Sequence, residues 1–417
     1  MRSFAPRRRR ALPVAAAALA ALLLSACSAG AKVEVPWLGL SLRLPGATPT
    51  PPLQAIAPQR TGAPTPGTPQ LTVAEFVPIA EQFVEQHRGL KFKSPVQVTL
   101  LDDAAFRERL LGKQSSSPGN DQAVATTSKD LVAVHLIAKT VDLGSSARNL
   151  LGAGVSGFYD PKSKSLVVRG EAATPYVRQV IVHELTHALQ DQWFGIDRPE
   201  LDKADDERGV AFQTVVEGDA VRIENEYRDA MPPLEQLQAA QEERDQGGGL
   251  PADIPRVLVE LVAFPYILGP RFIDELDQLG GQQKIDDAFV HPPVSTQQII
   301  DFNRYAAGDT PHTLPLPRAD ATAYDHGVLG EFGLLLLLEN VAKMSAADAV
   351  AAARTWGGDE YVAWVKGGTP CLRFSMLAFT PSQQAPLDAA LRSFTRAAGA
   401  SFSDPTGNGP ALVTTCG

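Results

Sequence analysis

His183-Glu184-Leu185-Thr186-His187 is the segment from which both the fold and the chemistry of this chain can be argued. Two histidines four residues apart lie one above the other on an α-helix, because four residues span little more than one turn. Their imidazoles can therefore bind one metal ion, and the glutamate between them can act as a base. The segment predicts a metal-binding helix with His183 and His187 as ligands and Glu184 beside them.

The flanking residues predict that this helix runs from residue 175 to residue 193. Thr174 suits the N-cap, Pro175 suits the first helical position, and Gly195 follows the predicted end. Apolar residues recur at helical spacing, and the two histidines project from nearly the opposite side. The apolar stripe consists of Val177, Ile181, Leu185, Ala188 and Leu189. A single histidine is most often a hydrogen-bonded interior residue, but this pair with its glutamate favours a metal site.

A second long helix is predicted for residues 205–229. Its apolar stripe consists of Phe212, Val216, Ala220, Ile223 and Tyr227. Glu217 lies at the flank of that stripe, where its carboxylate can reach a neighbouring helix. We therefore predict Glu217 as the third metal ligand, with Glu224 as the alternative. Gly218 is unfavourable by about 1 kcal/mol relative to alanine in a helix interior, which indicates a close approach of another helix.

Three motifs together resemble a group of bacterial exported metallopeptidases of the gluzincin type. They are His183-Glu184-Leu185-Thr186-His187-Ala188-Leu189-Gln190-Asp191-Gln192, Val216-Glu217-Gly218-Asp219-Ala220 and His291-Pro292-Pro293-Val294-Ser295-Thr296. The resemblance covers residues 72 to about 366 and implies one zinc ion held by two histidines and one glutamate. The chain departs from the thermolysin-like pattern at Val221, where that pattern has an aspartate. Asp219 and Asp191 are the alternatives for the group that orients the first histidine.

The resemblance implies an α+β fold, a mainly helical zincin-like metallopeptidase with a small sheet or hairpin beside the active-site helix. The sequence supplies such a hairpin, because two strand-like runs at residues 157–159 and 165–168 flank the turn sequence Asp160-Pro161-Lys162-Ser163. In zinc peptidases of this architecture, a sheet edge aligns an extended peptide by main-chain hydrogen bonds. This hairpin is the candidate for that role, and a purely structural hairpin is the alternative.

The predicted activity is the hydrolysis of peptide bonds in a peptide or protein substrate. Glu184 accepts a proton from the attacking water and passes it to the leaving amine. The oxyanion usually needs a further donor, and His326, His291 and Tyr324 are the candidates, with His326 preferred as the catalytic residue. Two alternatives stay open. One is an inactive surface binding or structural protein on a peptidase scaffold, and the other is a metal-dependent amidase acting on cell-wall material.

The N-terminus predicts export. Arg2 and the four arginines at residues 7–10 form a basic region, and residues 11–24 form an apolar stretch too short to be a comfortable membrane span. Leu24-Ser25-Ala26-Cys27 resembles the lipobox of bacterial lipoproteins, which implies cleavage before Cys27 and lipidation of that residue. An ordinary secretory signal is the alternative. We therefore expect a lipid-anchored protein on the extracytoplasmic side of the cell membrane.

The charge of the chain limits the classes of partner. Removal of residues 1–26 takes away five arginines and no acidic residue, so the formal net charge changes from −9 to −14. An acidic body argues against nucleic acid or anionic lipid as an electrostatic partner. Membrane attachment is then expected to come from the lipid. The sequence does not indicate an oligomeric state.

Composition divides the chain into three parts. Residues 1–26 are the predicted signal peptide, residues 27–70 are a lipid-anchored tether, and residues 71–417 are a zincin-like domain with a C-terminal helical and strand extension. Residues 45–69 contain eight prolines and five threonines, which suits an extended tether. In an export setting, Cys371 and Cys416 are predicted to form a disulfide that ties down the C-terminal tail. Two free thiols are the alternative.

Overall fold

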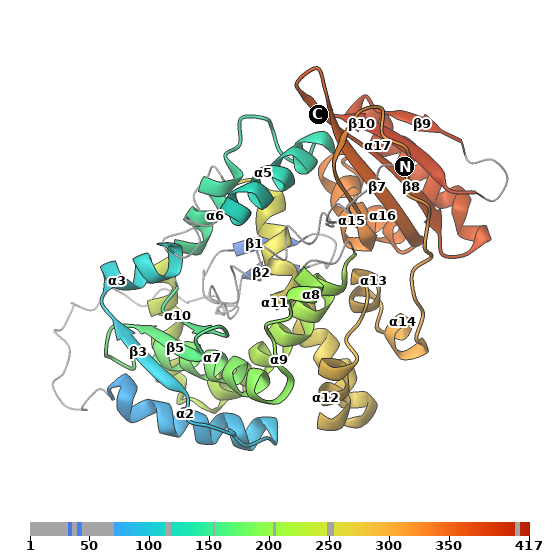
Figure 1. Ribbon diagram of the computed structural model, residues 1–417. Coiled ribbons are helices and arrows are strands. Elements are labelled where there is room, and N and C mark those ends of the chain that lie inside the picture. Colours follow the sequence, from blue (N-terminus) through green and yellow to red (C-terminus); the bar gives the residue numbers. More distant parts are fainter. Residues whose placement is uncertain are drawn as a thin grey trace, which may run out of the picture.

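A computed structural model describes residues 32–35, 40–43, 71–112, 118–152, 155–202, 206–247, 254–404 and 409–417. The predicted signal peptide, Cys27 and most of the predicted tether lie outside these residues. The described part is α+β, mainly helical with small sheets. A three-stranded sheet lies at one end of the molecule and a five-stranded sheet at the other, with long helices between them (Figure 1). A separate hairpin pairs β1 (Lys32–Val35) with β2 (Leu40–Arg43).

The three-stranded sheet contains the predicted hairpin. Its order is β3 (Gln97–Leu101), β5 (Ser165–Arg169) and β4 (Gly157–Asp160), with β3 parallel and β4 antiparallel to β5. The carboxylate of Asp160 closes the turn, because it accepts hydrogen bonds from the Lys162 amide and the Ser163 hydroxyl. The hairpin prediction is confirmed, and β4 is an edge strand that contacts the next helix, α7 (Pro175–Phe194).

The helix α7 (Pro175–Phe194) has the predicted bounds to within one residue. The Thr174 hydroxyl caps it by accepting from the amide of Val177, and Gly195 follows its end. Its environment differs from the prediction, because nearly every residue from Tyr176 to Asp191 is buried. The helices α2 (Val73–Arg88), α9 (Arg208–Ala230) and α10 (Pro233–Gly247) enclose it together with β4 and β5. The histidine face is therefore covered by protein, which a single apolar stripe did not indicate.

The helix α9 crosses α11 (Arg256–Gly280) at a pair of glycines. A Cβ atom on Gly218 would lie 2.3 Å from the carbonyl carbon of Gly269, so only glycine fits this crossing. The close approach predicted from Gly218 is confirmed. The sequence of residues 254–285 predicts helical material interrupted at Pro265 and at Gly269-Pro270. That prediction is wrong, because α11 continues through both prolines. Its packing along α9 offsets the backbone hydrogen bonds that the two prolines remove.

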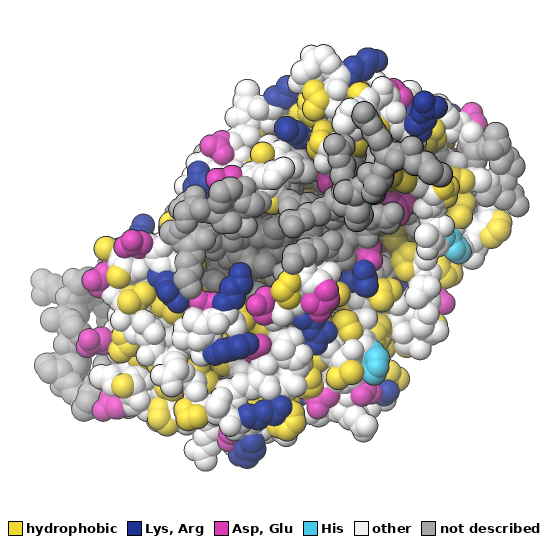
Figure 2. Space-filling model, in the orientation of Figure 1, with side chains coloured by type: hydrophobic (Ala, Val, Ile, Leu, Met, Phe, Trp, Pro, Cys, Tyr) yellow, Lys and Arg dark blue, Asp and Glu magenta, His cyan; other side chains and the backbone are white. Residues whose placement is uncertain are grey.

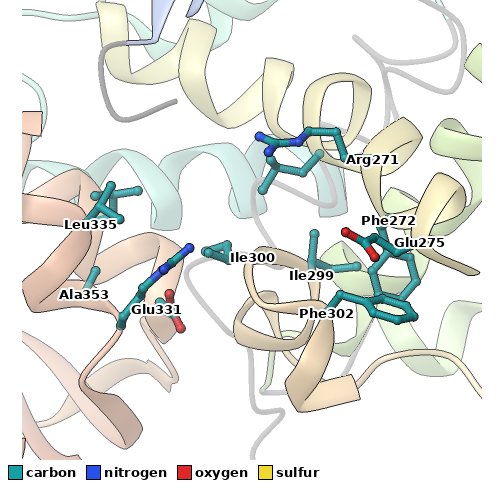
Figure 3. Close-up of a pocket in the computed structure, with 12 residues that line it drawn as sticks. Arg271, Phe272, Glu275, Ile299, Ile300, Phe302, Glu331, Leu335 and Ala353 are labelled. Atoms are coloured by element: carbon teal, nitrogen blue, oxygen red, sulfur yellow. The ribbon is translucent and has the colours of Figure 1, made fainter. Parts of the chain in front are cut away.

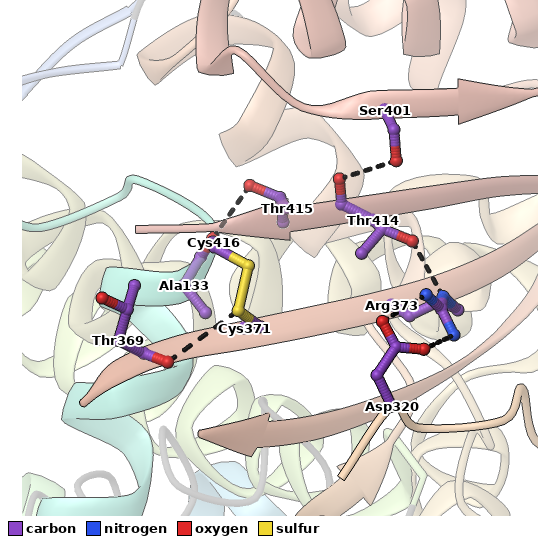
Figure 4. The surroundings of a disulfide bond; sticks show 9 residues. All are labelled: Ala133, Asp320, Thr369, Cys371, Arg373, Ser401, Thr414, Thr415 and Cys416. Carbon is purple, nitrogen blue, oxygen red and sulfur yellow. Dashed lines mark hydrogen bonds and ion pairs between the residues drawn. A yellow bond between two sulfur atoms is a disulfide. The ribbon is translucent and has the colours of Figure 1, made fainter. Parts of the chain in front are cut away.

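The five-stranded antiparallel sheet forms the C-terminal end. Its order is β6 (Ala323–Gly327), β7 (Trp356–Lys366), β8 (Thr369–Ala378), β10 (Ala411–Cys416) and β9 (Ser401–Ser403). The helices packed with it are α15 (Gly330–Asn340), α16 (Ala346–Ala353) and α17 (Gln384–Ala398). A disulfide joins Cys371 of β8 to Cys416 of β10, and Thr415 donates a hydrogen bond to the Ala133 carbonyl (Figure 4). The C-terminal strand is thus tied both to its own sheet and to α5 (Pro118–Ala133).

The shorter elements connect these parts. They are α3 (Asp103–Arg107), η2 (Glu108–Gly112), α6 (Leu143–Gly152), α8 (Pro199–Asp202), α12 (Gln282–Val290), α13 (Thr296–Ile300), α14 (Phe302–Ala307) and η3 (Pro381–Gln383). One hydrophobic cluster runs from Val73 to Val413 and includes residues of both large sheets. Basic and acidic side chains are interspersed over the face in Figure 2. Among the described helices, none combines the length and apolar character needed to cross a membrane.

Buried polar contacts join the start of α9 to the C-terminal part. The turn sequence His291-Pro292-Pro293 predicts a following helix capped by Ser295, and Ser295 does cap α13. The next residue, Thr296, donates its hydroxyl hydrogen to Glu207 and accepts from the amide of Phe332. Glu207 also lies against Gly330, where a Cβ atom would overlap its carboxylate. The third motif therefore builds an internal junction between α9, α13 and α15.

The buried carboxyl of Glu207 predicts a stability that falls with rising pH. Burial raises the pKa of Glu207 to about 8, against the lowering effect of the Thr296 hydrogen bond. A carboxyl with a raised folded-state pKa stabilises the fold fully below its unfolded pKa, and this contribution is lost as pH rises through the folded value. We expect the free energy of unfolding to fall between about pH 4.5 and 8, by up to about 1.4 kcal/mol per pH unit from this group.

Glu207→Gln should remove this part of the pH dependence, because glutamine can still accept from Thr296 but does not ionise. The measurement is urea unfolding of both proteins from pH 5 to pH 8.5, with chelator present throughout so that metal binding does not contribute. If the free energy of unfolding depended on pH in the same way in both proteins, Glu207 would not be the source of this pH dependence.

Candidate metal centre

Two helices bring the predicted ligands together. His183 and His187 on α7 meet Glu217 on α9, and one ligand atom of each lies within 4.8 Å of the other two. The Nε2 atoms of both histidines lie 3.4 Å from Oε2 of Glu217. All three side chains are buried. The structure thus assembles the residues that the sequence predicted as the metal ligands.

These separations fit a bound metal ion better than direct contacts among the three groups. Good N–H···O hydrogen bonds span about 2.7–3.2 Å, so 3.4 Å is long for one. Ligand atoms about 2.0–2.2 Å from a tetrahedral zinc ion lie about 3.3–3.6 Å apart, which matches both nitrogen–oxygen distances. Two imidazole nitrogens and one carboxylate oxygen are also ligands that zinc accepts. The three residues could therefore hold such an ion with a fourth position left for another ligand.

Glu224 orients the first histidine. Its Oε2 atom lies 2.9 Å from Nδ1 of His183, so the ring donates its Nδ1 hydrogen to the carboxylate. This hydrogen bond fixes the tautomer in which the Nε2 lone pair faces Glu217. The prediction of Asp219 or Asp191 for this role is wrong, and Glu224 is an orienting group here and not a replacement ligand. Two helical turns separate Glu217 from Glu224, which places both on the same face of α9.

Gln190 orients the second histidine. Its Oε1 atom lies 3.0 Å from Nδ1 of His187. Its amide nitrogen donates to Asp219 at 3.0 Å and to the carbonyl of Val216 at 3.1 Å. Because the nitrogen has two acceptors, the amide is fixed with its oxygen toward His187. Asp219 therefore supports the second histidine through Gln190, and not the first histidine as one prediction had it.

A buried arginine holds Asp219 in place. Arg88 donates from Nε to Asp219 at 2.7 Å and from a terminal nitrogen to Asp286 at 2.6 Å. Its guanidinium also lies 5.7 Å and 5.6 Å from the ring centres of Phe194 and Phe289. Burial raises the pKa of Asp219, but Arg88 and Arg222 outweigh it, so the pKa stays below its ordinary value. Asp219 is therefore a carboxylate, as its role as acceptor requires.

Glu184 lies between the metal group and the edge of the small sheet. Its Oε2 atom accepts from the amide of Tyr159 on β4 at 2.7 Å. Its other oxygen, Oε1, is buried and accepts no hydrogen bond from the described residues. Burial raises the pKa of Glu184 to about 7, although the two imidazoles and the Tyr159 amide act against it. One oxygen is thus fixed and the other is available, which suits a group that accepts a proton.

Glu217 differs from Glu184 in its charge state although both are fully buried. Burial raises the pKa of Glu217, but the adjacent imidazoles outweigh it and hold that pKa at about 2. Glu217 is therefore ionised, as a metal ligand must be. The two carboxyls on neighbouring helices are separated in role by their surroundings: one is a permanent anion and the other titrates near neutrality.

The three candidates for the oxyanion donor lie elsewhere. His326 is on β6, opposite Val362 at the edge of the five-stranded sheet. The Tyr324 hydroxyl donates to Asp130 on α5, and His291 is exposed just after the end of α12. The catalytic role of His326 remains a prediction.

Comparisons with known proteins add no assignment: no family model, no curated protein and no solved structure matches this chain. The function is therefore inferred from the geometry of the site and from the sequence motifs.

Glu224 offers a test of how the site is held. Glu224→Gln removes the charge that accepts from His183, so we expect zinc affinity to fall by about 10- to 100-fold while the fold is retained. The measurement is competition with a chromophoric chelator. Glu226→Gln is the matched control, because Glu226 lies two residues further along α9 and contacts His87 and Arg222 instead. Unchanged affinity in Glu224→Gln would contradict the orienting role.

Proposed function

We propose that the protein is a zinc metallopeptidase of the zincin type, with His183, His187 and Glu217 as ligands and Glu184 as the general base. One observation carries the proposal. Side chains from two helices converge, with both histidine Nε2 atoms 3.4 Å from Oε2 of Glu217, and a carboxyl with an available oxygen lies beside them. A purely structural zinc site would usually have four protein ligands and no need for such a base.

The zinc ion and the protein side chains would have different roles in the reaction. Zinc, when bound, would act as a Lewis acid toward water and the substrate carbonyl. Glu184 accepts a proton from the attacking water on its available oxygen and then donates it to the leaving amine. The Tyr159 amide holds the other oxygen of Glu184, so the base keeps its direction during the reaction. Glu224 and Gln190 keep the two imidazoles in the tautomer that leaves each Nε2 atom without a proton.

The edge strand β4 supports a peptide as the substrate. Main-chain groups of alternate residues in an edge strand point away from the sheet, and the Tyr159 amide does so toward Glu184. Gly157, two residues earlier, presents its main chain on the same side. The Tyr159 amide is engaged by Glu184, so an extended peptide would pair with the other main-chain groups on this side of β4 and lie beside the base; the proposal includes this mode of binding. It also includes export and a lipid anchor at Cys27, which the N-terminal sequence supports.

The test is hydrolysis of a library of internally quenched peptides and of casein by the purified protein. We expect cleavage that is abolished by a zinc chelator and restored when about one equivalent of zinc is returned. Cleavage that persists in the chelated protein would contradict the proposal. Zinc-loaded protein that cleaves no peptide in the library would favour the inactive scaffold instead.

A further inference from the structure

A second cavity lies away from the metal centre, between α11 and the C-terminal helices. It has a volume of about 250 Å³ and is lined by residues of α11, α13, α14, α15 and α16 together with Arg354. Arg271 and Glu275 of α11 stand on one side, Glu331 and Leu335 of α15 stand on the other, and Ile299 and Ile300 lie between them (Figure 3). None of the lining residues belongs to the metal group. The cavity therefore needs an explanation of its own.

Two arginines at this cavity are available to an anion. Arg271 and Arg354 both line it and both are exposed. Neither forms an ion pair within 4 Å or a side-chain hydrogen bond with another residue that the structure describes, although Arg354 lies close enough to Glu331 to act against the rise in that carboxyl's pKa. A guanidinium binds a carboxylate through two parallel hydrogen bonds, so a carboxylate is a group that these side chains suit.

The rest of the lining is apolar apart from two acids. Phe272, Phe302, Ile299, Ile300 and Leu335 supply a surface for one apolar group of side-chain size. Glu275 is exposed at the rim, whereas Glu331 is buried with only 1% of its surface exposed. Oε1 of Glu331 has no hydrogen-bond partner among the described residues, although Gln297 lies near the carboxyl; burial raises the pKa of Glu331 well above its ordinary value, so this group is a neutral carboxyl whose oxygen can accept. Because a buried polar atom without a partner is unfavourable, a ligand that brings a donor would be favoured here.

We propose that this cavity binds the free carboxyl end of a short peptide or an acylated amino acid with an apolar side chain. The carboxylate pairs with Arg271 and Arg354, the side chain contacts the isoleucines and phenylalanines, and the amide N–H is directed toward Glu331. The proposal commits to this chemistry over a fatty acid, because a fatty acid has a carboxylate and an apolar chain but no N–H donor. It concerns binding alone and does not depend on the peptidase assignment.

The cavity also has a physical connection to the metal centre. Arg271 and Phe272 lie on α11 within one turn of Gly269, where α11 touches α9, and Glu275 lies one turn further along the same helix. A ligand in the cavity therefore contacts the helix that packs against the segment carrying Glu217. Binding can be measured without catalysis, so a failed peptidase assay and a failed binding assay are separate results.

The experiment is calorimetric titration with three probes: N-acetyl-alanyl-leucine, the same peptide with a C-terminal amide, and octanoate. Chelator is present so that no carboxylate binds to zinc, and Glu184→Gln protein is used alongside the wild type so that no probe is consumed. We expect the free acid to bind at least about tenfold more tightly than the amide, because a charge-assisted pair is lost in the amide. Octanoate is expected to bind more weakly than the free acid.

Variants locate the binding. Arg271→Gln and Arg354→Gln should each lower the affinity for the free acid by about tenfold and leave the affinity for the amide unchanged. Arg392→Gln is the matched control, because Arg392 is an exposed arginine on α17 that pairs with Asp404 and lies outside the cavity. Equal affinity for the free acid and the amide, or full affinity in both cavity variants, would overturn the proposal. Octanoate that binds as tightly as the peptide would replace it with a fatty-acid site.

Discussion

Glu184→Gln is expected to lower kcat for peptide hydrolysis by about 10²- to 10⁴-fold while the protein still binds one zinc ion. Glutamine has the same shape and can accept the Tyr159 amide hydrogen, so the fold and the metal ligands are retained. It cannot accept a proton from water, and the loss therefore falls on the chemical step and not on substrate binding. The measurement is steady-state cleavage of the best library peptide, with zinc content determined on the same samples.

Glu235→Gln is the control for this substitution, because Glu235 pairs with Arg178 at the start of α10 and touches no residue of the metal group. It should cleave at the wild-type rate. If Glu184→Gln cleaved as fast as this control, Glu184 would have no part in the reaction. If it lost zinc as well as activity, the separation between base and ligands proposed for this site would be wrong.

The crossing of α9 and α11 predicts the largest effect on stability. In Gly218→Ala, the new Cβ atom would lie 2.3 Å from the carbonyl carbon of Gly269, and in Gly269→Ala it would lie 2.5 Å from the carbonyl oxygen of Thr214. Both neighbours are backbone atoms, so the helices must move apart. We expect the free energy of unfolding to fall by about 3 kcal/mol or more, at the upper end of the range for overpacked cores. Zinc affinity should fall too, because Glu217 precedes Gly218.

Gly333→Ala is the matched control for the crossing. Gly333 is also inside a helix, α15, but its nearest contact would be the Leu329 Cβ atom at 3.3 Å. The higher helix propensity of alanine should offset that contact, so we expect a change within about 1 kcal/mol. Chemical denaturation of the three variants gives the comparison. Equal stability of Gly218→Ala and Gly333→Ala would contradict the tight crossing.

The parts of the fold that depend on local chemistry could be predicted from the sequence. The Thr174 cap, the turn at Asp160 and the Ser295 cap each follow from a side chain that bonds a backbone group within a few residues, so neighbouring residues suffice. Tertiary packing decided the rest. The prolines of α11 predicted interruptions that its packing overrides. The sequence of residues 129–139 likewise predicts a helix, but α5 begins earlier, at Pro118, and ends at Ala133.

The candidate site divides in the same way. The spacing of His183 and His187, together with the position of Glu217 at the flank of an apolar stripe and the resemblance of both motifs to gluzincins, predicted that these three side chains meet. The partners of the two imidazoles could not be predicted, because Asp191 on α7 and Asp219 and Glu224 on α9 are all acids within two turns of a predicted ligand. Only the crossing of α7 with α9 decides which of them reaches His183. The hydrogen bond from the Tyr159 amide to Glu184 could not be predicted either, because every residue except proline has a main-chain N–H and the residue type does not indicate which one is used. The signal that was available for Glu224 was its position two turns after Glu217.

The central claim is that a metal ion joins α7 to α9 through Glu217. The most direct test is the zinc content of purified wild-type protein and of Glu217→Ala, measured by mass spectrometry after dialysis against a weak chelator. We expect about one zinc ion per chain in the wild type and a small fraction of that in Glu217→Ala, with both proteins folded by circular dichroism. A folded wild-type protein that holds no zinc, or an equal zinc content in the two proteins, would contradict the account.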